Sequence, residues 1–487
     1  GRRPARGTES GSQADSFAHF VARWQLMKLY AAPLDFRSIA REFNVRTGFA
    51  LELHTQAAQL KDRFAGSRTD ARSVPLVTID PAGSMDLDQA VHIERRAGGG
   101  FVVRYAIADV AAFVAPGSGV AEESLERGQT IYLPDEPARL HPEELSEGSA
   151  SLLPEVDRPA VLWTFKLDDA GEVDAAHVER ALVRSVARLD YEGVHADMQA
   201  GTVHPSITLL EEVGRLRQQS SLRRHAVNLR LPSVRVVGDG DTFELVIEPR
   251  HPVMDYNSEI SLLTGMVAGR MMVDAGVGFL RTLGPADASG EAEFRREAGN
   301  LGYQVAGDIG EFLASVDADT PRGMAVMREA QKLLRGSGYV DLSAGEPEVH
   351  AGIGGYYSHV TAPLRRLIDR YATEVCLAIC AGTDVPEWVK RDAPRVIKTM
   401  GRSSQLANTV EKASLHLTEA TVLKPWVGHN FDGVTLKTGE EAARVFIVDP
   451  PVLAPSTGAP EEGAETKFSL VRADPTAREV GFAWPAD

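Results

Sequence analysis

The chain has 487 residues, with 43% hydrophobic and 25% charged side chains, so it is long enough for two to four globular domains around a large core. Its 52 lysines and arginines are outnumbered by 68 aspartates and glutamates, which gives a net charge of −16 and excludes a general nucleic-acid coat protein. If the protein binds RNA, we expect a local basic channel, and no run of roughly 18 apolar residues predicts a membrane helix.

The N-terminus and the cysteines bear on cellular location. Residues 1–7 are not followed by an apolar run, so we expect a flexible tail and no secretory signal. The two cysteines, Cys376 and Cys380, lie four residues apart in a helical pattern, which favours buried packing in a reducing cytoplasm over a disulfide or a metal site. We therefore predict a cytoplasmic protein with no membrane partner, and we expect a monomer.

The first predicted module is helical. Residues 16–64 carry apolar side chains at helix-like spacing, with a second amphipathic stretch at 35–43 and a turn at 44–48. Short helices joined by a turn are typical of a helix-turn-helix or winged-helix module, and a small helical bundle packed on the next domain explains the pattern equally well. Residues 66–72 indicate a linker, so we place this domain at residues 1–70.

An acidic loop follows the linker. Residues 75–79 predict a buried strand, Asp80 closes it, and residues 81–84 predict a tight turn. Asp86 and Asp88 lie two apart in the next extended run and should share a face. Neighbouring carboxylates repel one another unless cations hold them ionised, and oxygen ligands suit Mg2+, with Mn2+ as an alternative. The spacing therefore predicts a metal site.

Two other interpretations fit the acidic loop alone. A structural Ca2+ loop, or acids on a solvated turn, explains a bare Asp-x-Asp more often than a catalytic site does. The nucleophile loop of haloacid-dehalogenase-type phosphatases also contains Asp-x-Asp, but its strand runs directly into that motif. Here the strand ends at Asp80, six residues before Asp86.

Strands and helices alternate over the next part of the chain. We expect strands at 101–110 and 244–250 and helices at 209–222 and 260–274. Asp109, at the end of the first strand, either supports the metal site or makes hydrogen bonds at the strand end.

A second motif lies near residue 360. Thr361 is a suitable N-cap and Pro363 suits a first helical turn, so we expect a helix that begins here and runs to Ala381. Arg365 would then lie at a helix N-terminus, where its guanidinium can hold a phosphate through two hydrogen bonds.

Nearby residues predict structural contacts. Arg366 and Asp369 have salt-bridge spacing. His359 is expected to be a hydrogen-bonded core histidine and not a general base. A further helix is predicted at 404–423, and it carries Glu411.

The C-terminal segment predicts a small barrel. Residues 426–487 contain alternating strand patterns separated by a flexible acidic loop at 454–465, which is typical of an OB-type domain. Its basic and aromatic content is sparse, so the pattern predicts the OB-type fold but gives little support for RNA binding.

In this order, the segments at 74–423 resemble the signatures of the ribonuclease II/R catalytic domain (RNB) family. The family's first signature has four aspartates spaced D-x5-D-x-D-D; Asp80, Asp86 and Asp88 match the first three, and Gln89 stands in place of the fourth. Three later segments resemble the family's "Y-L-P", "P-x-x-L-S…S-L-x-P" and "Y-x-H-F-T-S-P-I-R-R-Y-x-D" signatures: residues 128–134, 141–158 and 352–369.

The resemblance implies an α+β fold with an RNB catalytic domain at 71–425. It implies a hydrolytic, Mg2+-dependent 3′→5′ exoribonuclease that degrades single-stranded RNA processively to nucleoside 5′-monophosphates. Asp80, Asp86 and Asp88 would hold the metal, while Gln89 offers only a neutral carbonyl oxygen, which binds a hard cation less well.

The resemblance also implies roles along the RNA. Tyr132 would pack on the 3′-terminal nucleotide, and Tyr191 would read the ribose 2′-hydroxyl. Arg365 would hold the scissile phosphate and, with Asp88 and Tyr132, carry catalysis. Leu229 stands where the family often has an aromatic that stacks on the last base, so we expect a clamp that is weaker or built differently. The other positions implied to bind RNA are Glu259, Arg366 and Glu411.

Two alternatives remain at this point. The missing fourth aspartate permits an RNA-binding pseudonuclease. The N-terminal module permits a DNA-binding regulator, and it is also a candidate to bind structured RNA.

Overall fold

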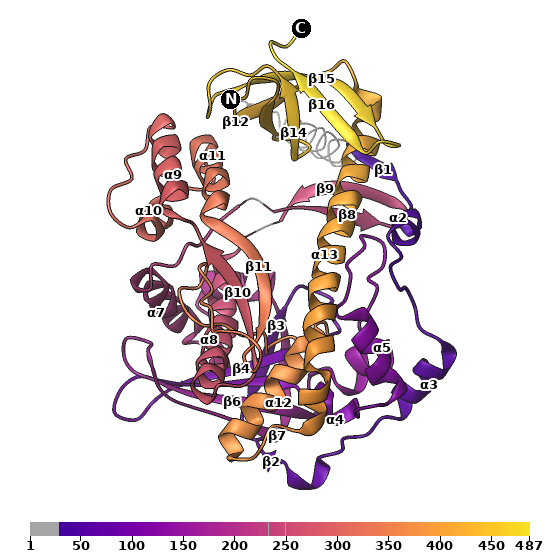
Figure 1. Ribbon diagram of the computed structural model, residues 1–487, viewed down its shortest axis with the longest axis vertical. Coiled ribbons are helices and arrows are strands. Elements are labelled where there is room, and N and C mark those ends of the chain that lie inside the picture. Colours follow the sequence, from indigo (N-terminus) through magenta and orange to yellow (C-terminus); the bar gives the residue numbers. More distant parts are fainter. Residues whose placement is uncertain (1–28, 232, 249) are drawn as a thin grey trace, which may run out of the picture.

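The computed structural model describes residues 29–231, 233–248 and 250–487, and its centre is a mixed sheet (Figure 1). Neighbouring strands are antiparallel except in the parallel pairs that β7 forms with β2 and β3, and β6 also pairs with β7. In spatial order the strands are β2 (Thr69–Asp70), β7 (Val173–Asp190), β3 (Leu76–Asp80), β4 (Gln89–Arg95), β5 (Phe101–Ala108) and β6 (Asp157–Leu167). The expected α+β class is confirmed.

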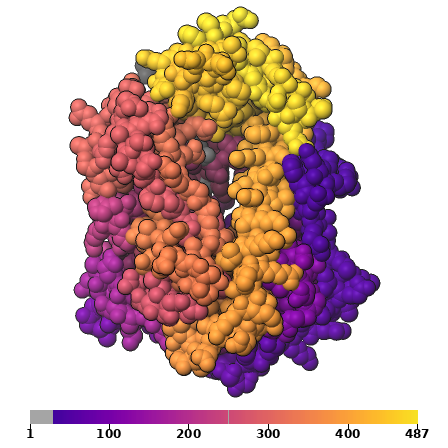
Figure 2. Space-filling view, viewed as in Figure 1, coloured from indigo at the N-terminus to yellow at the C-terminus, as the bar shows by residue number. Residues whose placement is uncertain are grey.

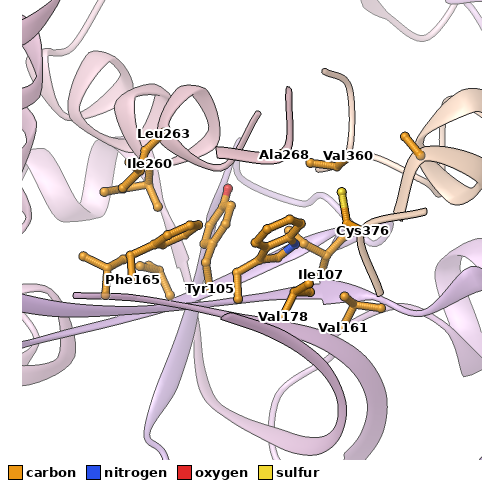
Figure 3. Packing of buried hydrophobic residues seen from close by; sticks show 14 of the residues in the cluster. Tyr105, Ile107, Val161, Phe165, Val178, Ile260, Leu263, Ala268, Val360 and Cys376 are labelled. Atoms are coloured by element: carbon orange, nitrogen blue, oxygen red, sulfur yellow. The ribbon is translucent and has the colours of Figure 1, made fainter. Parts of the chain in front are cut away.

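Helices α8 (Pro252–Ala275) and α12 (Leu367–Ala381) cover one face of the sheet. In Figure 3, Tyr105 and Phe165 rise from the strands towards Ile260 and Leu263 of α8, and Cys376 of α12 completes the layer. These side chains are buried because residues two apart in a strand share a face, and that face is apolar. Cys376 is a free, buried thiol, as expected.

Shorter elements surround this layer. The helices are α4 (Val110–Phe113), α5 (Gly119–Arg127), α6 (Tyr191–Ala200) and α7 (Leu210–Arg223). Two predicted boundaries were wrong. Helix α8 begins at Pro252 and not at residue 260, because a proline in the first turn starts the helix earlier. Helix α13 (Glu387–Leu423) has 37 residues instead of the 20 predicted at 404–423, and it continues through Pro394.

A three-helix insertion lies between β10 (Phe279–Pro285) and β11 (Leu334–Asp341), which pair with each other. We call it the helical lobe; it consists of α9 (Ala288–Asn300), α10 (Ile309–Ser315) and α11 (Pro321–Glu329). Its apolar core includes Phe294 and Val326 and continues into Val434 and Phe446 of the C-terminal domain. The lobe therefore supports that domain from one side.

The C-terminal domain is a closed five-stranded barrel, which confirms the predicted OB-type architecture. In spatial order its strands are β12 (Asn430–Lys437), β13 (Ala443–Ile447), β14 (Val452–Thr457), β16 (Glu479–Ala483) and β15 (Glu465–Asp474). The barrel core continues into Ala420 and Leu423 at the end of α13. The barrel is thus held between α13 and the helical lobe, at the top of Figure 1.

The described N-terminal residues do not form a separate module. Strand β1 (Ala31–Pro33) pairs with β9 (Thr242–Ile247), which in turn pairs with β8 (Val234–Asp239). Phe36, just before α2 (Arg37–Glu42), packs on Phe243 with ring centroids 4.9 Å apart. Helix α3 (Leu51–Gln59) instead contacts α5, where the Gln56 side chain accepts a hydrogen bond from Val120.

Because α2 and α3 pack on different parts of the protein, the predicted helix-turn-helix or winged-helix arrangement is not confirmed. The first predicted helical stretch lies mostly in residues 1–28, outside the described residues. Within the described ranges, no helix has both the length and the apolar character needed to cross a bilayer.

Candidate active site

The acidic loop joins β3 to β4 and is held by a serine distant in sequence. The Ser84 N–H donates to the Pro81 carbonyl, and Gly83 has a φ of 84°, so the predicted tight turn is present. The Ser151 hydroxyl accepts from the Leu87 N–H at 2.9 Å and donates to the Met85 carbonyl at 2.6 Å. Sequence analysis placed Ser151 in a family signature without assigning it this role.

Two carboxylates of the loop are poorly compensated. Burial raises the pKa of Asp80 to about 7, and repulsion from Asp86 adds to the shift. Burial raises the pKa of Asp88 to about 8, although Arg365 and the Leu364 N–H both oppose the shift. A cation beside these groups would favour their ionised forms.

The donor set fits a hard divalent cation in its chemistry. Asp80, Asp86 and Asp88 present oxygens only, and Asp80 Oδ2 is buried without a hydrogen-bond partner in the described structure. Across the described ranges, no three His, Cys, Asp or Glu side chains already converge closely enough to hold a metal. The three aspartates therefore stay predicted ligands.

The loop at residues 361–366 lies against the acidic loop. The Leu364 N–H donates to Asp88 Oδ1 at 2.9 Å, and the Gln89 side-chain amide donates to the Thr361 carbonyl at 2.5 Å. On its other side, the Arg365 carbonyl accepts from the Thr130 N–H at 3.0 Å. The structure thus brings Asp88 and Gln89 against the loop that carries Arg365.

The predicted helix start at this loop was wrong. Helix α12 begins at Leu367, and Arg366 is its N-cap in an extended conformation, paired with Gln129 in an isolated bridge. Thr361 and Pro363 precede the helix, because the extended backbone of Arg366 separates them from the first helical residue, Leu367. The exposed Arg365 side chain therefore projects from a tethered loop and not from the first turn of a helix.

The two predicted RNA-contacting tyrosines lie beside the acidic loop. Tyr132 is 55% exposed, and its hydroxyl lies in the field of Arg365, Asp86 and Asp88. Tyr191 begins α6, and its hydroxyl lies 3.3 Å from the side-chain amide of Asn257. An exposed aromatic ring beside a cation and carboxylates is suited to stack on a terminal base next to a phosphate.

Three arginines pair with two buried aspartates. Arg366 donates two hydrogen bonds to Asp369, at 3.1 and 3.0 Å, which confirms the predicted salt bridge. Asp109 is buried between Arg68 at 2.7 Å and Arg180 at 3.0 Å. Its predicted strand-end role is therefore confirmed.

His359 is a core residue, as predicted. Its Nδ1 lies 2.9 Å from the Tyr339 hydroxyl, and burial with nearby arginines holds its pKa well below the usual range.

Three predicted RNA-binding residues have no described contact with the acidic loop or with the loop at residues 361–366. Leu229 packs on the apolar core of the helical lobe. Glu259 faces Arg217 and Arg224, and burial raises its pKa to about 7. Glu411 is an exposed residue of α13.

Asn257 and Arg188 were missed by sequence analysis. Asn257 lies two residues before Glu259 on α8 and therefore on nearly the opposite side of the helix; its amide reaches both Tyr191 and the Ile79 carbonyl. Arg188 of β7 acts on the Asp80 carboxylate, and its guanidinium lies 3.1 Å from the Met85 sulfur. No local pattern marks either residue, because both are placed by strand and helix register.

An opening passes through the molecule near this site. Figure 2 shows it between α13 and the region of β11, with the barrel above it. In the corresponding ribbon view, β3 and β4 lie below it (Figure 1).

Comparison with known proteins finds family models that match both the central region and the C-terminal barrel. The family model of the RNB domain matches residues 68–379, and that of the RNase II-type exonuclease C-terminal S1 domain matches residues 429–484. Ribonuclease R of Chlamydia pneumoniae is 25% identical over 355 residues, which cover 69% of this chain and 52% of that protein. The chain thus spans about half the length of the curated relatives it matches.

Two solved folds are similar. RNase R of Mycoplasma genitalium, without RNA and in complex with ribose-methylated single-stranded RNA, has a TM-score of 0.83 at 17% identity, covering 92% of this chain and 77% of that one. Yeast Ssd1, described as a pseudonuclease, has a TM-score of 0.66 at 16% identity, covering 86% of this chain and 53% of that one. At these identities the likeness concerns the fold alone.

Proposed function

Because the chain belongs to the RNB-domain family, we propose that it is a metal-dependent 3′→5′ exoribonuclease that hydrolyses single-stranded RNA processively to nucleoside 5′-monophosphates. The observation that carries the proposal is the contact between two loops. Through Asp88 and the Leu364 N–H, uncompensated carboxylates lie against the loop that presents Arg365. Phosphodiester hydrolysis needs this combination of anionic metal ligands and a cation for the phosphate.

Each residue has a role in this proposal. Asp80, Asp86 and Asp88 would hold Mg2+ or Mn2+, which when bound supplies a Lewis acid and a more acidic water. Arg365 donates to the non-bridging oxygens of the scissile phosphate, whose negative charge increases in the transition state. Tyr132 stacks on the terminal nucleotide and orients that phosphate. Tyr191, steadied by Asn257, is placed for the ribose 2′-hydroxyl.

The opening beside α13 provides a path for a single strand. Its surroundings, the barrel and the helical lobe, enclose it on several sides (Figure 2). A strand threaded through such an opening is retained between successive cleavages, which favours processive shortening from one end. We assign residues 71–425 to catalysis and residues 426–487 to guiding RNA.

A pseudonuclease is the second candidate, favoured by Gln89 at the fourth acidic position and by the structural likeness to Ssd1. A DNA-binding role for residues 1–70 has less support, because α2 and α3 pack on the rest of the chain.

The test uses a 5′-labelled single-stranded oligoribonucleotide with Mg2+, Mn2+ or EDTA. Wild-type protein is compared with Asp88→Asn and with Asp384→Asn, an exposed carboxylate that serves as the matched control. We expect a ladder that shortens from the 3′ end, is abolished by EDTA and by Asp88→Asn, and is unchanged by Asp384→Asn. RNA binding without shortening in either metal would support the pseudonuclease instead.

A further inference from the structure

Gln89 makes a contact that a carboxylate at its position cannot make. Its side-chain amide donates to the Thr361 carbonyl at 2.5 Å. A backbone carbonyl can only accept, so the NH2 group of Gln89 is the end that faces it, and the amide orientation follows from the partner. Gln89 is half-buried and Thr361 is buried, so this hydrogen bond is largely shielded from water.

This contact is one of two neighbouring hydrogen bonds between the start of β4 and the loop at residues 361–366. Asp88 accepts from the Leu364 N–H, and Gln89 donates to the Thr361 carbonyl three residues earlier. The loop donates the first hydrogen bond and accepts the second, so the start of β4 binds both a donor and an acceptor of the loop. Arg365 follows Leu364 directly, and its own carbonyl is held by Thr130.

We propose that Gln89 is a positioning residue for Arg365 and that this role requires its neutral amide. In this proposal Gln89 does not substitute for a missing metal ligand. The proposal rests on the proposed function only for its kinetic consequence. With Glu at position 89, a carboxylate oxygen would face the Thr361 carbonyl, and two acceptors without a proton between them repel; Asp is one methylene shorter and has no donor to offer. The loop would then lose one of its two hydrogen bonds to the start of β4.

The direct test measures backbone hydrogen exchange in peptides that cover residues 360–367. We expect Gln89→Glu and Gln89→Asp to exchange several-fold faster than wild type in this segment. The matched control is Gln56→Glu, because the Gln56 oxygen accepts from the Val120 N–H and a carboxylate can accept in the same way. Exchange in residues 360–367 that is equally slow in all four proteins would overturn the proposal.

A kinetic readout separates positioning from metal binding. Misplacement of a transition-state cation lowers kcat with little change in KM, and we expect a loss of roughly 10- to 100-fold in Gln89→Asp. A Gln89→Asp protein that cleaves RNA faster than wild type would contradict the proposal, because the added carboxylate would then act as the missing ligand. If wild-type protein cleaves no RNA in any metal, the proposed function fails, whereas the exchange experiment still decides whether Gln89 holds the loop.

Discussion

Asp88 and Asp109 lie at the same end of the β4–β5 hairpin, yet within the described residues only Asp109 forms ion pairs with arginine side chains. The Asp88 carbonyl accepts from the Ala108 N–H at 2.8 Å, directly before Asp109. Asp109 is 1% exposed and contacts two arginines, at 2.7 and 3.0 Å. Asp88 is 6% exposed, and within the described ranges no cationic side chain lies at ion-pair distance from it.

The comparison separates two uses of a buried acid. A carboxylate that the fold provides with its own arginines stabilises the fold, because breaking such a pair leaves an uncompensated charge. For a carboxylate such as Asp88, which has one backbone N–H and no ion pair in the described structure, we propose that a cation from solution supplies the missing charge. This difference distinguishes Asp109 from Asp88 although both lie near the acidic loop.

The largest expected effect is the loss of activity in Asp88→Asn. The amide oxygen can still accept from the Leu364 N–H, while the charge needed for a metal is gone. We expect RNA shortening to fall by about 10³-fold or more, since metal catalysis contributes several kcal/mol. At pH 4, where burial keeps the Asp88 carboxyl protonated, the free energy of unfolding, measured by urea denaturation, should change by less than about 1 kcal/mol. Near-wild-type cleavage rates would remove Asp88 from the site.

Asp109→Asn should show the reverse pattern. It leaves Arg68 and Arg180 facing a neutral group, so we expect a loss of about 3 kcal/mol in the free energy of unfolding. The same urea titration measures it, with Asp384→Asn as control. Unchanged stability would show that the arginines are compensated elsewhere.

Glu419 sharpens the comparison as a buried acid without an assigned role. Burial on α13 raises its pKa to about 8, and Arg444 only partly opposes this. The folded state then binds the proton more tightly than the unfolded state, so this group lowers stability as pH rises from about 4.5 to 8. Glu419→Gln should therefore gain on the order of 2 kcal/mol at pH 9 and nothing at pH 4. Equal gains at both values would contradict the assigned cause.

The pH dependence of metal binding is the smallest effect. Asp80 and Asp88, with pKa values of about 7 and 8, must lose protons before they bind a cation. Affinity for Mn2+, measured by calorimetry, should therefore rise at least about tenfold between pH 6 and pH 8.5. Proton release, detected by repeating the titration in buffers of different ionisation enthalpy, should accompany binding. A pH-independent affinity would mean that these carboxylates are ionised without metal.

Local patterns predicted the parts of the site that depend on nearby residues. The strand before Asp80, the tight turn and the Arg366–Asp369 pair are all set by short-range spacing, and each is present. The start of α12 was missed because Arg366 is extended and forms a bridge with Gln129, which is distant in the sequence. No window of the sequence contains both partners.

The same reason explains why other contacts were not predicted. The partner of Gln89 is Thr361, 272 residues away, so the sequence suggested only a weak metal ligand. Each residue along a helix turns by about 100°, so Asn257 and Glu259 face different sides of α8, and only Asn257 reaches Tyr191 among the described contacts. The helical lobe and the anchoring of β1 depend on packing between distant segments, for which the periodicity of the chain holds no signal.

The most direct test of the account compares linear and circular RNA of the same sequence in the presence of Mg2+. The account predicts that wild-type protein shortens linear 5′-labelled RNA stepwise from its 3′ end, releases nucleoside 5′-monophosphates and leaves the circle intact. Cleavage of the circle, or binding of both RNAs with cleavage of neither, would contradict it.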